Sequence, residues 1–190
     1  MKKLLIAVIL GLFVGNTALF AQDLSPERKQ VIDSLALEKV RDLSKYIKIV
    51  GSKETPWSEA NRVIDRAEEL FAPDAEISVS TLASNEIKNY KVRQYLERLM
   101  RLNYDRVEID WYKIEYVSDL QRQPDGTYVG VITIFQAFKG FNKEGLLEYQ
   151  DVTKKDITVY VKRKETQIGG RVVGFWDVLL GDMRVKETAR

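Results

Sequence analysis

The sequence of 190 residues contains no cysteine and no histidine. Without cysteine there is no disulfide, no thiol nucleophile and no thiolate ligand for a metal. Without histidine, Ser-His-Asp catalysis, imidazole acid–base catalysis and histidine-bound zinc are excluded as well. We therefore expect neither a metal site nor a bound cofactor.

An excess of charge of one sign is also missing. The chain has 30 Lys and Arg against 28 Asp and Glu, and two of the basic residues, Lys2 and Lys3, lie in a segment that we expect to be removed. That leaves 28 basic against 28 acidic residues, a net charge of zero. Basic clusters at 154–155 and 162–164 flank Tyr160, but a balanced chain argues against binding of nucleic acid by bulk charge. We expect no nucleic-acid partner.

The first residues have the order of a secretory signal peptide. Lys2 and Lys3 precede a compact apolar run over residues 4–15 (LLIAVILGLFVG), and the following stretch 16–21 (NTALFA) ends at Ala21, before polar Gln22 and Asp23. The run is shorter than the roughly 20 residues that cross a bilayer, although an uncleaved signal anchor is the alternative. We expect a signal peptide over residues 1–21, no integral membrane segment after its cleavage, and an exported protein in the periplasm or outside the cell.

The remaining chain, residues 22–190, reads as a single globular domain. Hydrophobic residues make up 45% of the sequence and charged residues 31%, which is typical of a folded protein. Its first half has helical spacing, with a start signal at Ser25 and Pro26, a second helix after Pro56 and a third capped by Asn89. The apolar stripes of these three helices are Ile32, Ala36, Val40, Leu43, Ile47 and Val50; Ala60, Val63, Ile64, Ala67, Leu70 and Phe71; and Val92, Tyr95, Leu96, Leu99 and Met100.

The second half changes to the period of β-strands. Four long segments rich in β-branched and aromatic residues are separated by turns at 123–126 and 169–170, and this pattern predicts an antiparallel meander. Near Trp111 the apolar phase slips by one residue, which predicts a β-bulge. The four strands are predicted at 106–117, 127–138, 151–164 and 171–180, with a short strand at 76–82 between the second and third helices.

Residues 67–80 (AEELFAPDAEISVS) and the helical segment 92–102 (VRQYLERLMRL) carry a resemblance to a known family. The junction of an apolar helix end, Phe, Pro-Asp-Ala and a strand is similar to that of the nuclear transport factor two-like superfamily, also called SnoaL-like. The resemblance covers about residues 26–182. It implies an α+β fold in which N-terminal helices pack on a strongly curved antiparallel meander sheet, forming a cone. The superfamily includes isomerases, dehydratases, transport factors and catalytically silent domains, so the fold alone does not fix a function.

In enzymes of this superfamily a polar group in the cone acts on a small apolar ligand. Asp110 and Asp177 interrupt apolar strands, and an aspartate buried in the cone would have a raised pKa and act as a general acid or base. Tyr112 and Tyr116 would supply phenolic donors. The alternative is that both acids face outward and pair with basic residues, namely Lys113, Lys162 or Arg171. Because side chains alternate along a strand, Asp110 should share a face with Tyr112 and oppose Trp111, and Asp177 should oppose Trp176.

A ligand pocket is the second candidate site. Gln136 interrupts an apolar strand, where it would hydrogen-bond a ligand or else satisfy groups at a bend. Aromatic residues at strand spacing either line the pocket or fill the core. These aromatic pocket candidates are Trp111, Phe135, Phe138, Phe175 and Trp176.

Two functions stay open. The first is an exported, non-catalytic ligand-binding or assembly domain of the cell envelope, whose partner is a small apolar molecule or an envelope protein and which forms a homodimer through its sheet. The alternative is a cofactor-free isomerase or dehydratase-like enzyme acting on a small apolar ligand in the cone. An enzyme requires an acid in an enclosed site beside a tyrosine hydroxyl, whereas a binding domain requires only an apolar surface.

Overall fold

The computed structural model describes residues 24–82, 84–116 and 118–189, without the side chains of residues 84, 85 and 116. The signal peptide predicted over residues 1–21 lies outside the described residues. The helices are α1 (Pro26–Gly51), α2 (Trp57–Glu68) and α3 (Val92–Met100). The strands are β1 (Glu76–Thr81), β2 (Ser84–Lys91), β3 (Arg106–Tyr116), β4 (Gln121–Arg122), β5 (Tyr128–Phe141), β6 (Leu147–Ile168) and β7 (Arg171–Ala189).

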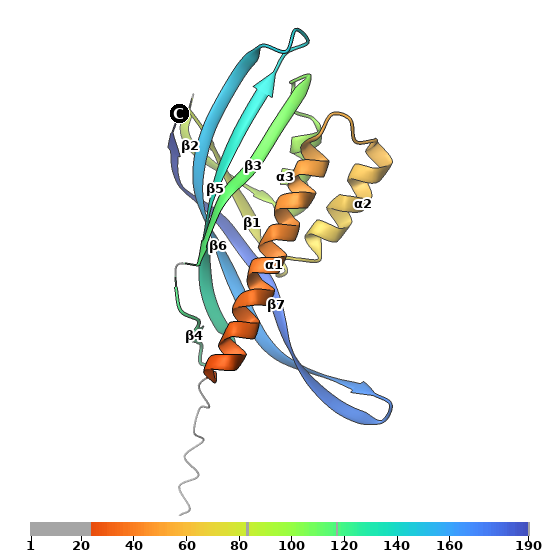
Figure 1. Cartoon of the computed structure of the whole chain (residues 1–190), viewed down its shortest axis with the longest axis vertical. Helices are drawn as coiled ribbons and strands as arrows, with labels where there is room; N and C mark the ends of the chain where they lie inside the picture. Colours follow the sequence, from red (N-terminus) through yellow and green to blue (C-terminus); the bar gives the residue numbers. More distant parts are fainter. Residues whose placement is uncertain (1–23, 83, 117, 190) are drawn as a thin grey trace, which may run out of the picture.

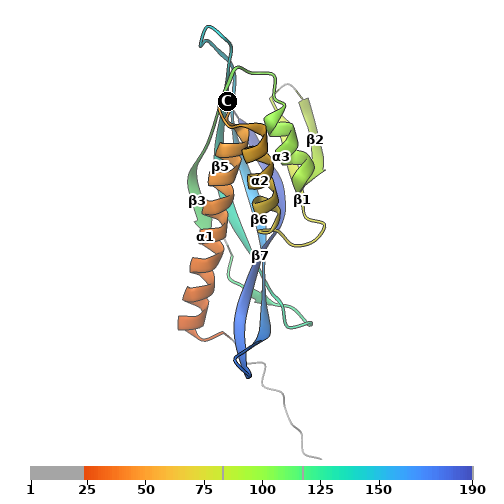
Figure 2. The ribbon, with the colours of Figure 1, turned by 90° about the vertical axis from the view of Figure 1, so that its right-hand side faces the viewer.

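Three helices cover one face of a single curved sheet (Figures 1 and 2). The strand order is β2-β1-β7-β6-β5-β3, and β4 pairs with β5 outside this path. The long strands β3, β5, β6 and β7 follow one another as an antiparallel meander, as predicted. β1 joins the edge of β7 in the parallel direction, with Ile77 opposite Met183, so the sheet is mixed at that one junction. The predicted α+β class, with helices packed on a curved meander, is confirmed.

The core lies between the helices and the face of the sheet turned toward them. All six apolar residues predicted for the first helix are at most 1% exposed, and the helix begins as predicted, with Ser25 as its N-cap and Pro26 in its first turn. Across the core, Ile132, Ile134 and Ile157 of β5 and β6 are fully buried. Burial of each such side chain contributes about 1.5–3 kcal/mol to folding. These side chains therefore stabilise the packing of the helices on the sheet.

The third helix starts later than predicted. Asn89, expected as its N-cap, belongs to β2, and its side-chain oxygen accepts a hydrogen bond of 2.7 Å from the Ser78 hydroxyl on β1. The helix begins at Val92, after Lys91. Pairing of residues 84–91 with β1 overrides the local capping signal, since the paired strand satisfies backbone groups that a free loop would leave open.

The predicted β-bulge is present in β3. Trp111 lies opposite Gln136 and Lys113 opposite Phe135, so Tyr112 is the extra residue. Ile109 and Trp111, which precede the bulge, are buried on the inner face, and Ile114, which follows it, packs against the same core. The slip in the sequence pattern therefore results from this β-bulge, which bends the edge strand β3.

The ends of β6 and β7 continue past the body of the sheet as a projecting hairpin (Figure 1). Its tight turn uses Gly169 and Gly170, whose φ angles of +56° and +80° favour glycine. The hairpin exposes the apolar side chains Ile168, Val172, Val173 and Phe175. Within the described part of the chain, no helix has the length and apolar character needed to traverse a bilayer.

Candidate functional site

The two aspartates singled out from the sequence lie on the outer face of the sheet. Asp110 is mostly exposed, and its Oδ1 lies 2.6 Å from Nζ of Lys48. Asp177 is less exposed, and its Oδ2 lies 2.6 Å from Nζ of Lys164. The predicted alternation holds, because Trp111 and Trp176 point toward the helices. The outward orientation is thus the observed one, although the ion-pair partners differ from those expected.

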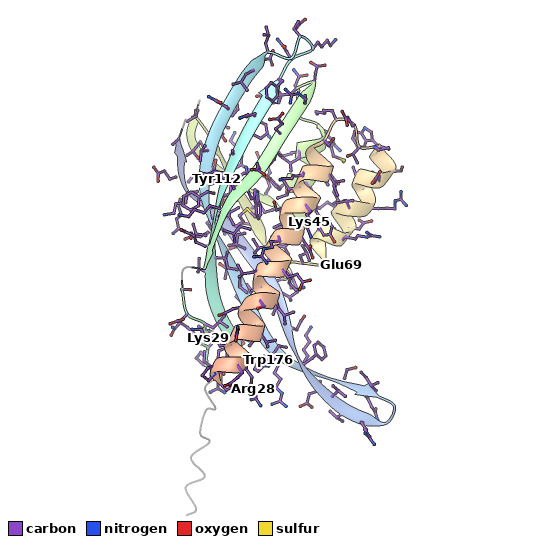
Figure 3. All side chains as sticks on the ribbon, in the orientation of Figure 1. Arg28, Lys29, Lys45, Glu69, Tyr112 and Trp176 are labelled. Atoms are coloured by element: carbon purple, nitrogen blue, oxygen red, sulfur yellow. The ribbon has the colours of Figure 1, made fainter. Side chains whose placement is uncertain are left out.

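The tyrosines proposed beside these acids do not form an interior donor pair. Tyr112 is 54% exposed and stands on the side of the sheet turned away from the helices (Figure 3). The side chain of Tyr116 lies outside the described part of the structure. The structure therefore does not bring Asp110, Asp177 and Tyr112 together inside the cone, since all three face outward.

A different set of polar residues occupies the inner face, where β6 begins. Tyr149, Asp151, Thr153 and Lys155 alternate along this strand and share its inner side; we call them the polar row. The pairing fixes their orientation, because Lys155 lies opposite the fully buried Ile134. Asp151 is only 7% exposed and Lys155 only 3%. Beyond Lys155 the same side of the strand is apolar, with Ile157, Val159 and Val161 all fully buried.

Asp151 is held by a hydrogen-bonded tyrosine. The Tyr149 hydroxyl donates to Oδ2 of Asp151 at 2.6 Å and accepts from the Leu82 amide at 3.2 Å. Burial raises the pKa of the Asp151 carboxyl, while Tyr149, the positive charge of Lys155 and Thr153 act in the opposite direction. Burial together with the bond to Asp151 raises the pKa of Tyr149 to about 12, so this hydroxyl remains a proton donor. An acid beside a tyrosine hydroxyl is the arrangement expected of an acid–base site.

Lys155 is the most deeply buried charged group of the row. Burial lowers the pKa of its ammonium to about 8, and the negative charge of Asp151 only partly opposes this shift. Its Nζ lies 5.6 Å from the centre of the Tyr95 ring on α3, within the range of a cation–π contact. Burial also raises the pKa of Tyr95, which keeps its hydroxyl protonated. Among the residues that the structure describes, Lys155 forms no ion pair within 4 Å.

Aromatic side chains surround the outer end of the row. The Phe138 ring lies directly across from Asp151, 5.9 Å from the ring of Tyr149 and 5.9 Å from that of Tyr104. Tyr104 lies flat over Gly140, where an added Cβ would come within 2.6 Å of its ring carbons. This close approach explains why a glycine stands near the C-terminal end of β5.

Only part of the predicted pocket gathers at the polar row. Trp111, Gln136 and Phe138 face the interior there, and the Trp111 indole donates a hydrogen bond of 3.1 Å to the Gln136 side-chain oxygen. Gln136 therefore orders a core tryptophan. Phe138 is the member of this group in contact with the row itself.

The other aromatic candidates lie elsewhere. Phe135 faces outward, its ring centre 6.0 Å from that of Tyr112. Phe175 is exposed on the projecting hairpin, and Trp176 packs edge-on against Tyr128 at 5.9 Å. These three do not line the inner site, because strand alternation and the length of the hairpin carry them away from it.

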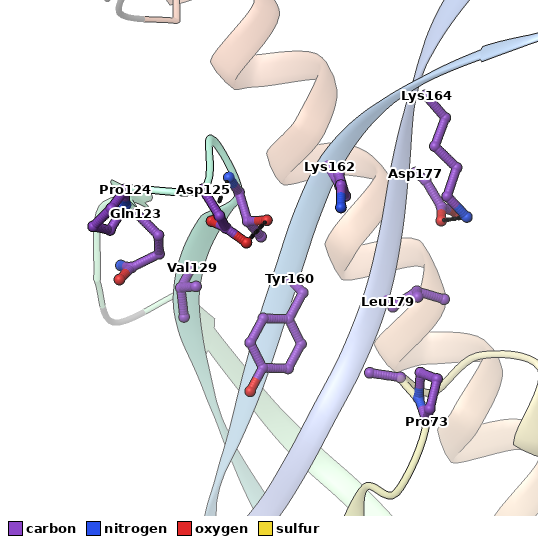
Figure 4. A pocket seen from close by; sticks show the side chains of 12 residues that line it. Pro73, Gln123, Pro124, Asp125, Val129, Tyr160, Lys162, Lys164, Asp177 and Leu179 are labelled. Carbon is purple, nitrogen blue, oxygen red and sulfur yellow. Dashed lines mark hydrogen bonds and ion pairs between the residues drawn. The ribbon is translucent and has the colours of Figure 1, made fainter.

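Two hollows on the surface contain the outward aspartates. The larger, of about 770 Å³, is lined by Pro73, Tyr160, Lys162, Asp177 and residues of the turn at 123–125 (Figure 4). The second, of about 610 Å³, lies beside Lys48 and Asp110. In both, the aspartate is already engaged in an ion pair with a lysine.

The candidate site offers acid–base groups and no metal-binding cluster. Within residues 24–82, 84–116 and 118–189, no group of three or more acidic side chains is placed to hold a metal ion. The chemistry available on the inner face consists of a carboxyl group, a primary amine and phenolic hydroxyls.

No protein-family model matches the sequence, and no curated protein does so. Among solved structures, the chain is similar to a proposed scytalone dehydratase from Novosphingobium aromaticivorans, at 12% identity over 85% of this chain and 89% of that one, with a TM-score of 0.42. It is also similar to a type 2 hexachlorocyclohexane dehydrochlorinase, LinA, at 14% identity over 84% and 91% of the two chains, with a TM-score of 0.39. At this level the likeness carries no argument about a substrate or a reaction.

Proposed function

We propose that the protein is a cofactor-free enzyme that transfers protons on a small, largely apolar molecule bound at the inner face of its sheet. The observation that carries this proposal is the buried Asp151 carboxyl with the Tyr149 hydroxyl bonded to it. A carboxyl with a raised pKa is a stronger base than one in water once it is ionised. The reaction class is removal of a proton beside a carbonyl group, as in an isomerisation or in the elimination of water.

Each group has a distinct role in this reaction. Asp151 takes the proton, and the bond from Tyr149 holds its carboxylate in one orientation. Tyr95 stays protonated, and its hydroxyl is the donor that we assign to the ligand oxygen on which negative charge develops. The rings of Phe138 and Tyr104 supply the apolar contacts. We propose further that this activity is exercised outside the cytoplasm, because residues 1–21 have the pattern of a signal peptide.

Solvent exchange tests the proposal without knowledge of the natural substrate. The folded protein is incubated in D₂O with a panel of cyclic ketones and enones, and deuterium uptake next to the carbonyl is followed by NMR. The wild type should accelerate exchange of at least one compound, and Asp151→Asn should lower that rate by about 10²–10⁴-fold. Asp110→Asn is the matched control, since this exposed aspartate should leave the rate unchanged. Exchange that Asp151→Asn leaves intact would overturn the proposal.

A second candidate function is a non-catalytic assembly domain. The projecting hairpin favours it, because its apolar side chains Val172 and Phe175 are 69% and 43% exposed. Sedimentation velocity of the wild type and of a Val172→Thr, Val173→Thr, Phe175→Thr variant tests it. Self-association that disappears in the variant would support assembly, and a monomer at all concentrations would remove the homodimer from consideration.

A further inference from the structure

Lys155 is a buried primary amine that the proton-transfer role of Asp151 does not use. It lies two alternate positions further along the inner side of β6 than Asp151, just before that side becomes apolar at Ile157, Val159 and Val161. Lysine is among the residues least often buried, and a structural buried lysine is expected to have a carboxylate against it. Here the described residues provide no ion pair within 4 Å, and Nζ lies 5.6 Å from the centre of the Tyr95 ring.

We propose that Lys155 forms an imine with the carbonyl group of a small aldehyde or ketone bound along the polar row. This inference rests on the proposed function, because it names the substrate class on which Asp151 acts. The neutral amine attacks the carbonyl carbon, a C–N bond forms, and the π-electron pair moves onto oxygen. Both amine protons leave with that oxygen as water, which gives C=N–Lys155 without any oxidant or reductant.

The surroundings of Lys155 favour this step. A nucleophilic lysine must be neutral, and desolvation in an apolar site is a common way to make it so. With a pKa of about 8, roughly half of the Lys155 amine is neutral at pH 8, compared with well under one per cent for a lysine of ordinary pKa. Once formed and protonated, the imine withdraws electrons from the adjacent carbon. The proton on that carbon is then the one that Asp151 takes.

The chain contains a matched control in the next residue. Lys154 faces the outer side of the sheet, with its Nζ 5.7 Å from the centre of the Phe135 ring. It is adjacent to Lys155 in the sequence but points in the opposite direction. A reagent whose reaction with lysines depends only on their solvent exposure will modify Lys154 and other surface lysines in preference to Lys155.

Reductive trapping tests the inference. The folded protein is incubated with benzaldehyde at pH 8, treated with sodium cyanoborohydride, digested and mapped by mass spectrometry. We expect the secondary-amine adduct on Lys155 at least tenfold above its occupancy on Lys154. It should be lost in Lys155→Arg and retained in Lys154→Arg. Cyclohexanone is the second probe, for a ketone.

The outcomes separate this inference from the proposed function. An adduct on Lys155 that also forms in Asp151→Asn supports imine formation independently of proton transfer. Adducts spread evenly over surface lysines, or an adduct level that Lys155→Arg leaves unchanged while its circular dichroism remains native, would overturn it. Exchange that depends on Asp151 but proceeds equally in folded Lys155→Arg would remove the imine while leaving the proposed function in place.

Discussion

The Tyr149 hydroxyl donates a hydrogen bond of 2.6 Å to Oδ2 of Asp151, two residues further along the same side of β6. This bond stabilises the ionised carboxylate, because an ionised acceptor strengthens a hydrogen bond. Burial raises the pKa of Asp151, and Tyr149 is the largest influence that lowers it.

The first prediction concerns this bond. Tyr149→Phe removes the donor, so the pKa of Asp151 should rise further above its ordinary value. NMR titration of the ¹³C-labelled Asp151 carboxyl measures it directly. A midpoint that is unchanged or lower than in the wild type would show that the hydroxyl does not stabilise the carboxylate.

The second prediction is that Lys155 costs the folded state stability. Its pKa is about 8 when folded and 10.5 in the unfolded reference, so below pH 8 folding must bury a charge that water solvates better. Lys155→Met should therefore stabilise the protein by up to about 3 kcal/mol at pH 7. Urea denaturation measures the difference, and Lys154→Met, at the outward neighbour, should change stability by less than about 0.5 kcal/mol.

The same residue predicts a pH dependence. Between pH 8 and pH 10 the unfolded chain keeps the proton that folded Lys155 has lost, so wild-type stability should rise with pH in this window. Above pH 10 the raised pKa values of Tyr95 and Tyr149 mean that the unfolded chain loses these protons before the folded protein does. The two tyrosines therefore lower the stability as the pH rises. Lys155→Met should lack the rise. A variant with the same slope as the wild type would mean that Lys155 is charged and solvated in the folded protein.

Much of the fold is predictable because its signals are local and apolar. The stripe from Ile32 to Val50 marks one buried face of a helix, and the slip near Trp111 marks the bulge. β2 was not predicted, since its residues, SNEIKNYK, show no alternation, and the strand exists through its pairing with β1. A polar strand that forms by pairing with a neighbouring strand, as β2 does with β1, leaves little signal in its own sequence.

The candidate site was missed for a physical reason that can be located in β6. The apolar residues Ile157, Val159 and Val161 define the inner phase of this strand. Continuing that phase toward the N-terminus places Lys155, Thr153 and Asp151 inside as well. Charged residues are normally exposed, so the alternation alone does not indicate that these three residues are buried. Asp110 and Asp177 attracted attention because apolar neighbours flank them, yet strand alternation sends an isolated polar residue outward.

The third prediction follows from that outward position. Asp110→Asn and Asp177→Asn each remove one member of a surface ion pair. Such pairs contribute about 0–1 kcal/mol, so each variant should stay within about 0.5–1 kcal/mol of the wild type. Thermal or urea denaturation checks this, with Asp151→Asn measured alongside. A loss above about 2 kcal/mol in Asp110→Asn would mean that its carboxylate is needed inside the fold.

The fourth prediction concerns export. The apolar run at 4–15 is too short to span a bilayer easily, so signal peptidase should cleave after Ala21. Expression in a Gram-negative host followed by osmotic shock should release a protein whose intact mass begins at Gln22. A membrane-bound species that retains Met1 would instead identify the segment as an anchor.

The last prediction tests how the aromatic wall beside Asp151 is held. In Gly140→Ala the new Cβ would lie 2.6–2.7 Å from three ring carbons of Tyr104, a distance that real Cβ atoms do not tolerate. Either the ring or the strand must move, and such overpacking costs about 1–3 kcal/mol. The φ angle of Gly140 lies outside the left-handed region, so the cost should come from the ring alone. Tyr104→Ala removes that ring, and Gly140→Ala should then cost less than about 0.5 kcal/mol. A double-mutant cycle measured by urea denaturation should therefore give a coupling of at least 1 kcal/mol. If Gly140→Ala destabilised the protein equally with Tyr104 present and in the Tyr104→Ala variant, the backbone of β5 would be what requires the glycine. The Tyr104 ring would then not be held against Gly140 beside the polar row.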